Sequence, residues 1–350
     1  MVSNMKFCYI NARNPYPMNE HLINGLAEEG HDIIEIKEEG QGLKKYTKVF
    51  WKLLKGKKEC NAIIIGYPLP LFAVLANFLT TKKIIFNAVA SQYEANIISR
   101  NMGKRFSFTA FKYWLIDFLA FHLSSKILLE SNSQINFINK LFFVSKNKLI
   151  RSWSGVNEKE FFYDSSFPKK KKFTVLFRGR FLPESGILTV IKAAKKLEED
   201  DIDFLVLGAG FFYKEVNQLI DELSPKNLTM ISETLSFKEL RGTMSSCHIS
   251  LGQLAVHPRL SRTLPCKLFE SLALKLPYIT GRNAGVLELL KENETCIAIN
   301  PDDPNDLARK IFSLKKSPEV LNTIAKQGYE LYKNKLTSKQ LAKEFIKNCF

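Results

Sequence analysis

Basic residues and one glutamate gather around two segments that each join a strand pattern to a helix pattern. The first segment, RGRFLPESGI, places Arg178 and Arg180 on either side of Gly179 at the end of an apolar run, with Gly186 near the start of the next helix. Backbone N–H groups and the helix dipole at such a helix start favour an anion, and arginine grips phosphate oxygens bidentately. The segment therefore predicts a phosphate-binding turn. The alternative is a surface turn whose arginines pair with nearby acids.

The second segment, HPRLSRTLPCKLFESLAL, predicts a helix that begins at Pro265, since proline suits a first helical turn. Lys267 and Glu270 are three residues apart and share a face of this helix, and Arg259 and Arg262 precede it. A carboxylate there can accept hydrogen bonds from ribose hydroxyls, while the cations hold a diphosphate at the helix start. The alternative is an exposed lysine–glutamate pair, worth roughly a few tenths of a kcal/mol.

A third segment, GAGFFY, follows the apolar run DFLVL. Gly208 and Gly210 begin like the dinucleotide-binding fingerprint, but the position of its third glycine is occupied by Tyr213. We therefore expect no nicotinamide site here, and the glycines predict only a close turn at a strand end.

The elements that must position these residues alternate between strand and helix patterns along the whole chain. The expected strands are KFCYIN, DIIEI, AIII, KIIF, KILL and LIRSW in the first half, and FTVLF, DFLVL, NLTMI, HISL, PYIT and CIAI in the second. Such alternation predicts an α/β fold with parallel sheets covered on both faces. The stretch SGVNEKEFFYDSSFPKKKK (154–172) has the composition of a linker. Ligands of such sheets bind beyond the carboxyl ends of the strands.

Length and charge narrow the class of protein. The chain has 350 residues, which suits two domains, and a formal net charge of +16. That charge predicts an anionic partner: nucleic acid, a membrane surface or a phosphorylated substrate. No nucleic-acid-binding motif supports the first of these.

The cysteines and the apolar runs give expectations about location and metals. The six cysteines show neither C-x-x-C nor zinc-like spacing, so we expect free thiols in a reducing cytoplasm and no metal site. No apolar run reaches the roughly 18 residues of a transmembrane helix. The first residues lack the apolar core of a signal peptide.

The segment KKYTKVFWKLLKGKK (44–58) predicts a basic amphipathic helix. Its lysines recur at helical spacing, at Lys44, Lys48, Lys52 and Lys55, close to Phe50, Trp51 and Leu54. Such helices lie on anionic bilayer surfaces, and the alternative is a solvated helix packed on the sheet. A further aromatic group is expected in the core rather than in membrane contact: Phe106, Phe108, Phe111, Tyr113 and Trp114.

The order of motifs in the second half resembles the donor-binding domain of glycosyltransferase family 4, in its polysaccharide and glycan biosynthesis branch. The matching segments are GRFLPESGI, FLVLGAG, LPCKLFESLALKLPYIT, GRNAGVLELL and INPDDPNDLARKI. In the first half, GVNEKEFF resembles the family's exit from its first domain. The resemblance implies the GT-B fold. Residues 1–155 would form an acceptor-binding Rossmann-like domain, 156–335 a nucleotide-sugar-binding one, and 336–350 a helix that returns to the first.

The resemblance also implies roles for particular residues. Glu270 matches the second glutamate of the family's Glu-x7-Glu motif, which binds the nucleotide ribose. Arg262 stands in place of the first glutamate, Ser185 in place of the motif lysine, and Ala284-Gly285 in place of a Gly-Gly pair. The candidates to supply the missing positive charge are Arg178, Arg259, Arg262 and Lys267.

In the first half, two loops are candidates for acceptor binding. The loop ARNPYPMNEH lacks the family's usual glycines, and the loop after KIIF offers Glu94, Ser91 and Arg100. The alternative for Glu94 is a solvated loop residue.

The implied activity is transfer of a sugar from a nucleotide-sugar donor to a glycan or lipid-linked acceptor, with retention of anomeric configuration. No metal or cofactor is expected, because basic residues and helix starts can neutralise the leaving diphosphate. The expected catalytic residues are Arg178, Arg180 and Glu94, and the expected donor-binding residues are Gly179, Gly186, Gly208, Arg259, Arg262, Lys267, Glu270 and Gly285. The missing first glutamate leaves open a non-catalytic GT-B partner or sugar-binding protein, and the charge leaves open a nucleic-acid-binding protein. The expected location is the cytoplasm, with peripheral association at the inner membrane face through residues 44–58.

Overall fold

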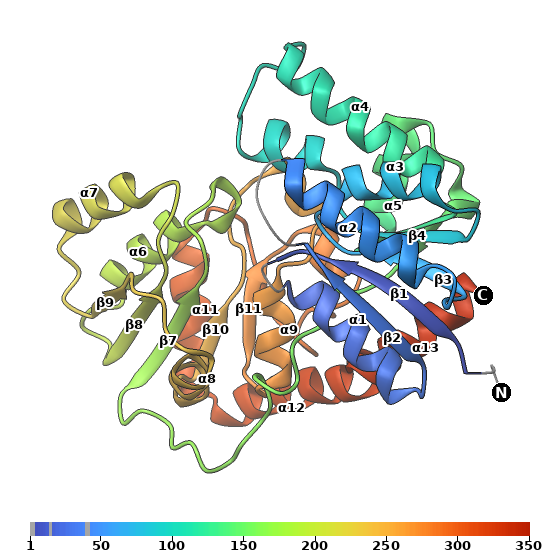
Figure 1. Cartoon of the computed structure of the whole chain (residues 1–350). Helices are drawn as coiled ribbons and strands as arrows, with labels where there is room; N and C mark the ends of the chain where they lie inside the picture. The colour runs from blue at the N-terminus through green and yellow to red at the C-terminus, as the bar shows by residue number, and fades with distance from the viewer. Residues whose placement is uncertain (1–3, 14–15, 39–42) are drawn as a thin grey trace. The chain divides into compact units, whose positions relative to one another are not determined.

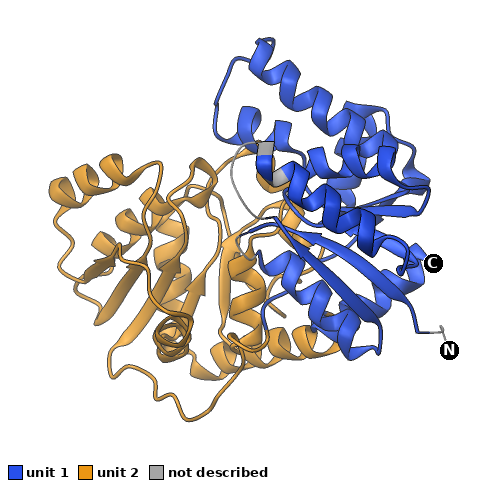
Figure 2. Cartoon of the chain, in the orientation of Figure 1, with its two compact units in different colours: residues 1–157, 336–350 blue, residues 158–335 orange. Residues whose placement is uncertain are grey.

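The computed structural model describes residues 4–13, 16–38 and 43–350, without the side chains of Leu43 and Lys45. Part of the first loop, residues 14–15, and the side chain of Lys45 in the basic stretch therefore lie outside the described residues. The chain divides into two compact units (Figure 2). Unit 1 comprises residues 1–157 together with 336–350, and unit 2 comprises residues 158–335.

Unit 1 contains a parallel six-stranded sheet in the order β2-β1-β3-β4-β5-β6 (Figure 1). All six expected strands are present, as β1 (Lys6–Asn11), β2 (Asp32–Lys37), β3 (Ala62–Ile65), β4 (Lys83–Val89), β5 (Lys126–Leu129) and β6 (Leu149–Arg151). In the sheet register, Phe7 of β1 lies opposite Ile33 of β2 and Ala62 of β3. Runs such as AIII are typical of parallel strands that are buried on both faces.

Two groups of helices cover this sheet. The described helices are α1 (Pro17–Glu28), α2 (Leu43–Gly56), α3 (Pro70–Leu79), α4 (Phe108–Leu123), α5 (Asn132–Phe142) and α13 (Ser338–Cys349), with a π-helix, η1 (Glu94–Ser99), and a 3₁₀ turn, η2 (Lys146–Lys148). The first apolar core joins α2, α3, α4 and α5 to one face of the sheet, and a second core joins α1 and α13 to the other. Gly25 lets α13 approach α1, because a Cβ at Gly25 would lie 2.0 Å from the carbonyl oxygen of Ser338.

The structure corrects the expectation for the aromatic group at the start of α4. Phe106 is 95% exposed, and Phe108 and Phe111 are exposed as well, whereas Tyr113 and Trp114 pack partly buried against the core. The expectation that all five are core residues was wrong, because α4 is apolar around most of its circumference. Only one side of such a helix can face the sheet, and composition does not say which.

Unit 2 contains a second parallel six-stranded sheet, in the order β12-β11-β10-β7-β8-β9. Its strands are β7 (Phe173–Arg178), β8 (Ile202–Leu207), β9 (Leu228–Ile231), β10 (Ile249–Leu251), β11 (Tyr278–Gly281) and β12 (Ile297–Ile299). After β7, the strands β8 and β9 are added on one side of the sheet; β10 then pairs with the other side of β7, and β11 and β12 follow beyond β10. The point between β7 and β10 is therefore the topological switch point, where ligands of open α/β sheets bind.

The helices of unit 2 connect these strands: α6 (Ile187–Lys196), α7 (Tyr213–Leu223), α8 (Phe237–Ser246), α9 (Cys266–Ala273), α10 (Ala284–Leu287), α11 (Pro304–Lys316) and α12 (Pro318–Lys335), with 3₁₀ turns η3 (Pro183–Ser185) and η4 (Pro258–Ser261). Helix α6 begins at Ile187, next to Gly186 as expected, because Gly186 adopts φ +70° and separates η3 from α6. The helix expected from Pro265 has that residue as its N-cap. Among the helices of the described segments, none is long and apolar enough to cross a membrane.

Candidate functional site

The switch point of unit 2 holds an ion pair between Arg178 and Glu270. Arg178 is the last residue of β7, and Glu270 lies on α9, which follows β10. The Arg178 Nη1 group donates a hydrogen bond to Oε2 of Glu270, whose side chain is almost fully buried. A carboxylate so placed is held by one oxygen, and its other oxygen can accept hydrogen bonds from a ligand.

Lys267, one helical turn before Glu270, brings a second cation to the same place. Its Nζ lies 4.1 Å from the centre of the Phe177 ring, and Lys267 as a whole is 8% exposed. The pKa of Lys267 is lowered to about 7, chiefly by burial and also by the neighbouring charge of Arg178, while the charge of Glu270 acts in the opposite direction. An anion beside this amine would favour its charged form, because opposite charges raise a lysine pKa.

Glycines bring the backbone of two strand ends against this cluster. Gly179 and Gly208 adopt φ values of +142° and +150°, in a region that side chains disfavour. A Cβ at Gly208 would lie 2.0 Å from the Gly179 carbonyl oxygen, and one at Gly179 would lie 3.2 Å from Nζ of Lys267. The turn is closed by the Phe181 N–H, which donates to the carbonyl of Ala209 at 3.1 Å. Arg180, between these contacts, is exposed.

The pair of Lys267 and Glu270 is not the exposed lysine–glutamate pair of the alternative interpretation. Both side chains are buried, and Glu270 pairs with Arg178, which is distant in sequence. That alternative was wrong because α9 packs both residues toward β7 rather than toward solvent.

Arg259, another expected donor-binding residue, forms an ion pair with a glutamate of a neighbouring turn. Its Nη1 group donates to Oε1 of Glu184 at 2.8 Å, and the Glu184 side chain is buried. This pair ties η4 to η3. The guanidinium is therefore engaged in holding two loops together, and sequence reasoning gave no sign of this because the partners are 75 residues apart.

The remaining expected donor-binding residues support the loops around the site. A Cβ at Gly285 would lie 2.8 Å from the backbone of Arg262 and Leu260, so Gly285 lets α10 pack on η4. Gly186 likewise packs on the backbone of Leu254 and Ala255, after β10. Arg262 is half-buried, and its Nη1 group donates to the Ser261 hydroxyl at 3.3 Å. The structure thus brings together Arg178, Gly179, Lys267 and Glu270. Gly186, Arg262 and Gly285 lie in the turns around them.

In unit 1, Glu94 is neither a substrate contact nor a solvated loop residue. It lies on the π-helix η1 with no exposed surface, and Oε2 of Glu94 accepts a hydrogen bond from Nε2 of Gln134 at 2.6 Å. Ser91 is buried and its hydroxyl accepts from the Glu94 N–H at 3.0 Å. Arg100 is exposed and donates to Asn96 at 2.9 Å. A fully covered carboxylate cannot touch an acceptor, so the expected catalytic role of Glu94 does not fit this structure.

A buried asparagine network occupies the switch point of unit 1, and sequence reasoning missed it. Asn19 accepts hydrogen bonds from the Tyr9 hydroxyl at 3.1 Å and the Tyr67 N–H at 2.9 Å. It donates to Oδ1 of Asn11 at 2.9 Å and to the Tyr67 carbonyl at 2.7 Å. This side chain joins the first turn of α1 to β1 and to the segment that follows β3. The signal available in the sequence was the pair of asparagines at a strand end and a helix start.

Unit 2 therefore offers a buried carboxylate, a guanidinium, a buried amine and the N-terminus of α9 at one edge of its sheet. Such groups can bind a molecule that carries both vicinal hydroxyls and phosphates. Among the residues that the structure describes, no three His, Cys, Asp or Glu side chains form a metal-binding group.

The second half of the chain matches a known protein family. Residues 158–331 match the family model described as Glycosyl transferases group 1. An uncharacterized glycosyltransferase of Methanocaldococcus jannaschii is 26% identical over 188 residues, which are 54% of this chain and 50% of that protein. The chain thus spans about half the length of this relative.

Two solved structures resemble the whole chain. Sucrose-phosphate synthase of Thermosynechococcus elongatus has a TM-score of 0.75 at 14% identity and covers 98% of both chains. HepE of Anabaena in complex with UDP-glucose has a TM-score of 0.74 at 14% identity and covers 99% of both chains. At these identities the likeness establishes the fold. Through residues 158–331 the chain belongs to the group 1 glycosyl transferases, and its two α/β units have the GT-B fold.

Proposed function

We propose that this protein transfers a sugar from a nucleotide-sugar donor to a glycan or lipid-linked acceptor, with retention of anomeric configuration. The observation that carries the proposal is the cluster of Arg178, Lys267 and Glu270 at the switch point of unit 2. The group 1 family match of the same residues supports it.

In this proposal Glu270 binds the ribose of the donor. Its Oε2 is held by Arg178, and its Oε1 accepts hydrogen bonds from the ribose hydroxyls. The similar fold of HepE, solved with UDP-glucose, supports a donor of this chemical class.

Lys267 and Arg180 bind the diphosphate of the donor. Lys267 lies against Gly179 at the start of the turn, and Arg180 follows that glycine with an exposed side chain. Fixed cations and backbone N–H groups stabilise the charge that develops on a leaving diphosphate. We propose that they do so without a metal ion.

The acceptor is proposed to bind through unit 1 and to be attached to lipid. The side chains of Lys44, Lys48, Lys52 and Lys55 on α2 are exposed, which supports contact between this unit and an anionic membrane surface.

Titration of the full-length chain with a panel of nucleotide sugars, by calorimetry, tests the donor site. Glu270→Gln should weaken binding about tenfold to a hundredfold, because ribose hydroxyls lose a charged acceptor worth roughly 1.5–3 kcal/mol. Glu292→Gln is the matched control, since Glu292 pairs with Arg282 at the surface of the same unit. Equal affinity of the Glu270→Gln variant and the parent would refute the proposed role of Glu270.

One observation favours a second candidate, a non-catalytic GT-B protein that binds a sugar or a partner enzyme. Arg262 stands where the family's first motif glutamate is expected, and its backbone packs closely against Gly285. Donor hydrolysis or transfer by the purified chain would exclude this candidate. Binding of a donor that survives prolonged incubation with acceptors would favour it.

A further inference from the structure

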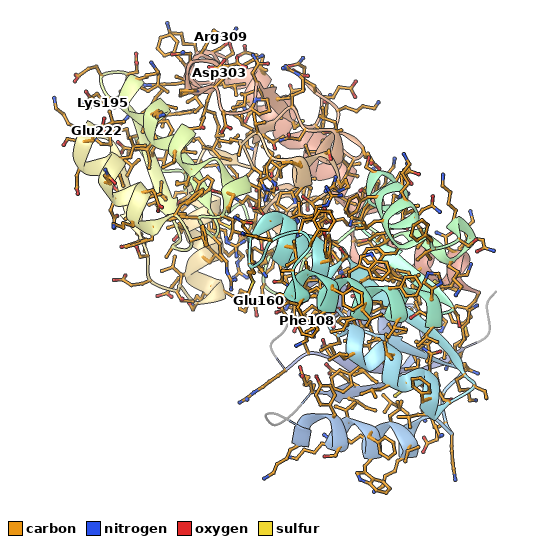
Figure 3. All side chains as sticks on the ribbon, turned by 90° about the horizontal axis from the view of Figure 1, so that it is seen from above. Phe108, Glu160, Lys195, Glu222, Asp303 and Arg309 are labelled. Atoms are coloured by element: carbon orange, nitrogen blue, oxygen red, sulfur yellow. The ribbon has the colours of Figure 1, made fainter. Side chains whose placement is uncertain are left out.

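Unit 1 exposes an apolar surface on three neighbouring helices, which we name the three-helix face: α2, α3 and α4. α3 packs against both α2 and α4, on the same side of the sheet (Figure 1). Exposed apolar side chains recur at a spacing of three or four residues along α3, at Leu71, Leu75 and Phe78, and along α4, at Phe108, Phe111, Leu115, Leu119 and Leu123. Phe108 lies at the start of α4 (Figure 3). Apolar stripes that point to solvent on adjacent helices mark an interaction surface.

A groove opens between α2 and α3 on this face. Its volume is about 340 Å³, and its lining includes Phe50 and Trp51 of α2 together with Leu75 and Phe78 of α3. Apart from Tyr46 and Thr47, its lining is aliphatic or carries Phe and Trp rings. Trp51 is 63% exposed and Phe78 is 76% exposed, so both side chains stand at the mouth of the groove.

The surroundings of the groove are basic and contain few acidic residues. Residues 43–123 contain 13 basic residues and three acidic ones. Two of these acids, Glu94 and Asp117, are buried, and the third, Glu59, pairs with Lys6 at 2.8 Å. Lys57, Lys58 and Lys82 line the hollow that adjoins Phe78 and Leu79. A partner for this face must therefore present negative charge around an apolar centre.

We propose that the three-helix face docks on an anionic lipid bilayer and that the groove between α2 and α3 takes one acyl chain of that bilayer. The lysines bind lipid phosphates, while Trp51 and Phe78 enter the acyl region, because cations at the headgroups and aromatic residues at the boundary are the favoured pattern for an interfacial helix. The inference extends the proposed function, since it identifies where a lipid-linked acceptor would meet the protein. Vesicle binding, however, needs no donor.

Co-sedimentation of the full-length chain with vesicles tests the docking. The parent should bind phosphatidylglycerol-containing vesicles roughly tenfold better than pure phosphatidylcholine vesicles, and less at high salt. Phe78→Gln should weaken this binding several-fold. Phe143→Gln, with a side chain of the same 76% exposure in the same unit but outside the three-helix face, should not. Reversal of Lys44, Lys48, Lys52 and Lys55 to Glu should abolish binding at low salt.

Quenching of tryptophan fluorescence tests insertion of the acyl chain. Lipids brominated along the acyl chain should quench Trp51, since Trp153 is buried and Trp114 is partly buried. Trp51→Phe keeps an aromatic side chain and should retain binding but lose most of the quenching.

Three results would overturn the proposal: no binding to anionic vesicles at low salt, binding without quenching, or equal losses in Phe78→Gln and Phe143→Gln. A stable dimer that Phe78→Gln dissociates, without vesicle binding, would show that a second copy covers the face. Calorimetric titration with nucleotide sugars on the same samples separates this proposal from the proposed function. Vesicle binding without donor binding upholds the docking and counts against the transferase activity.

Discussion

Both units contain a parallel six-stranded sheet, but they differ in strand order and in where they place charge. At the switch point of unit 1, neutral asparagine and tyrosine side chains form a buried network around Asn19. At the switch point of unit 2, the corresponding place holds Arg178, Lys267 and Glu270. Burying a charged group costs folding free energy unless the group is paired with an opposite charge or binds a ligand. The comparison is therefore in keeping with the proposed donor site in unit 2.

The net charges of the two units differ in the opposite sense, because unit 1 is the more positively charged. Unit 1 contains 24 basic and 12 acidic residues, a formal charge of +12, whereas unit 2 contains 27 and 23, a charge of +4. Most of the net charge of the chain thus lies in the unit whose interior switch point is neutral. A basic exterior favours binding to an extended anionic surface, whereas a few buried cations favour binding of a small anion.

The largest effect is expected from a substitution that breaks a buried ion pair of unit 2. Arg259→Met leaves Glu184 buried without its cation and should lower the free energy of unfolding by about 3 kcal/mol. All three tryptophans belong to unit 1, so tryptophan fluorescence follows unit 1 in urea while circular dichroism follows both units. The loss should appear in circular dichroism and leave the fluorescence midpoint unchanged.

The control for this prediction is Arg282→Met, which breaks an exposed pair with Glu292 and should cost under about 1 kcal/mol. Equal effects of the two substitutions would contradict the structural role of the Arg259–Glu184 pair. A joint shift of both probes would show that the units unfold together.

The next effect concerns turnover at the exposed end of the unit 2 cluster. Arg180→Ala should lower the rate of donor turnover about a hundredfold, because a fixed cation at the leaving diphosphate is removed. Arg180→Lys should lower it less, since the charge remains although the bidentate geometry is lost. Initial rates at saturating nucleotide sugar measure this. If both variants turn over like the parent, Arg178 is the better candidate for that role.

A smaller effect tests the buried asparagine network of unit 1. Asn19→Asp keeps the shape of the side chain but removes the amide that donates to Asn11 and to the Tyr67 carbonyl. Unit 1 should lose about 2 kcal/mol of unfolding free energy, because buried acceptors lose their donor. Tryptophan fluorescence in urea should report the loss. Asn61→Asp is the control, since Asn61 is exposed and accepts from the Lys6 N–H. A similar loss in the control would count against a special role for the buried network.

The smallest effect is a pH dependence of donor binding at the unit 2 cluster. Because the pKa of Lys267 is about 7, its charged form is lost as pH rises above that value. Affinity for a nucleotide sugar should therefore fall by at most about tenfold per pH unit above pH 7. Lys267→Arg should bind with little pH dependence, because its guanidinium stays charged.

The contribution of Lys267 to folding stability changes with pH in the opposite direction to its contribution to donor affinity. Its folded pKa lies below the ordinary value of 10.5, so the unfolded chain binds more protons between about pH 7 and 10.5. Lys267 therefore adds stability as pH rises through this window, and Lys267→Met should remove that gain. Parallel slopes in parent and variant would show that Lys267 keeps an ordinary pKa.

The sequence by itself determined the elements of this protein. Strand runs such as AIII and FTVLF, and the amphipathic pattern of residues 44–58, are local signals, because side-chain periodicity is set within each segment. The same holds for Gly186, whose positive φ marks a helix start. The spacing of Lys267 and Glu270 placed them on one helix face, and the family resemblance marked them as candidate donor-binding residues.

Only the tertiary structure decided which of these residues meet. Glu270 pairs with Arg178, 92 residues away, because β7 and β10 are neighbours in the sheet and α9 follows β10. Arg259, an equally plausible cation by sequence, is held by Glu184 instead. The exposure of Phe106 and Phe108 likewise depends on which side of α4 the sheet covers. Pairing and burial follow from strand order and helix packing, and both are set by contacts between residues far apart in the chain.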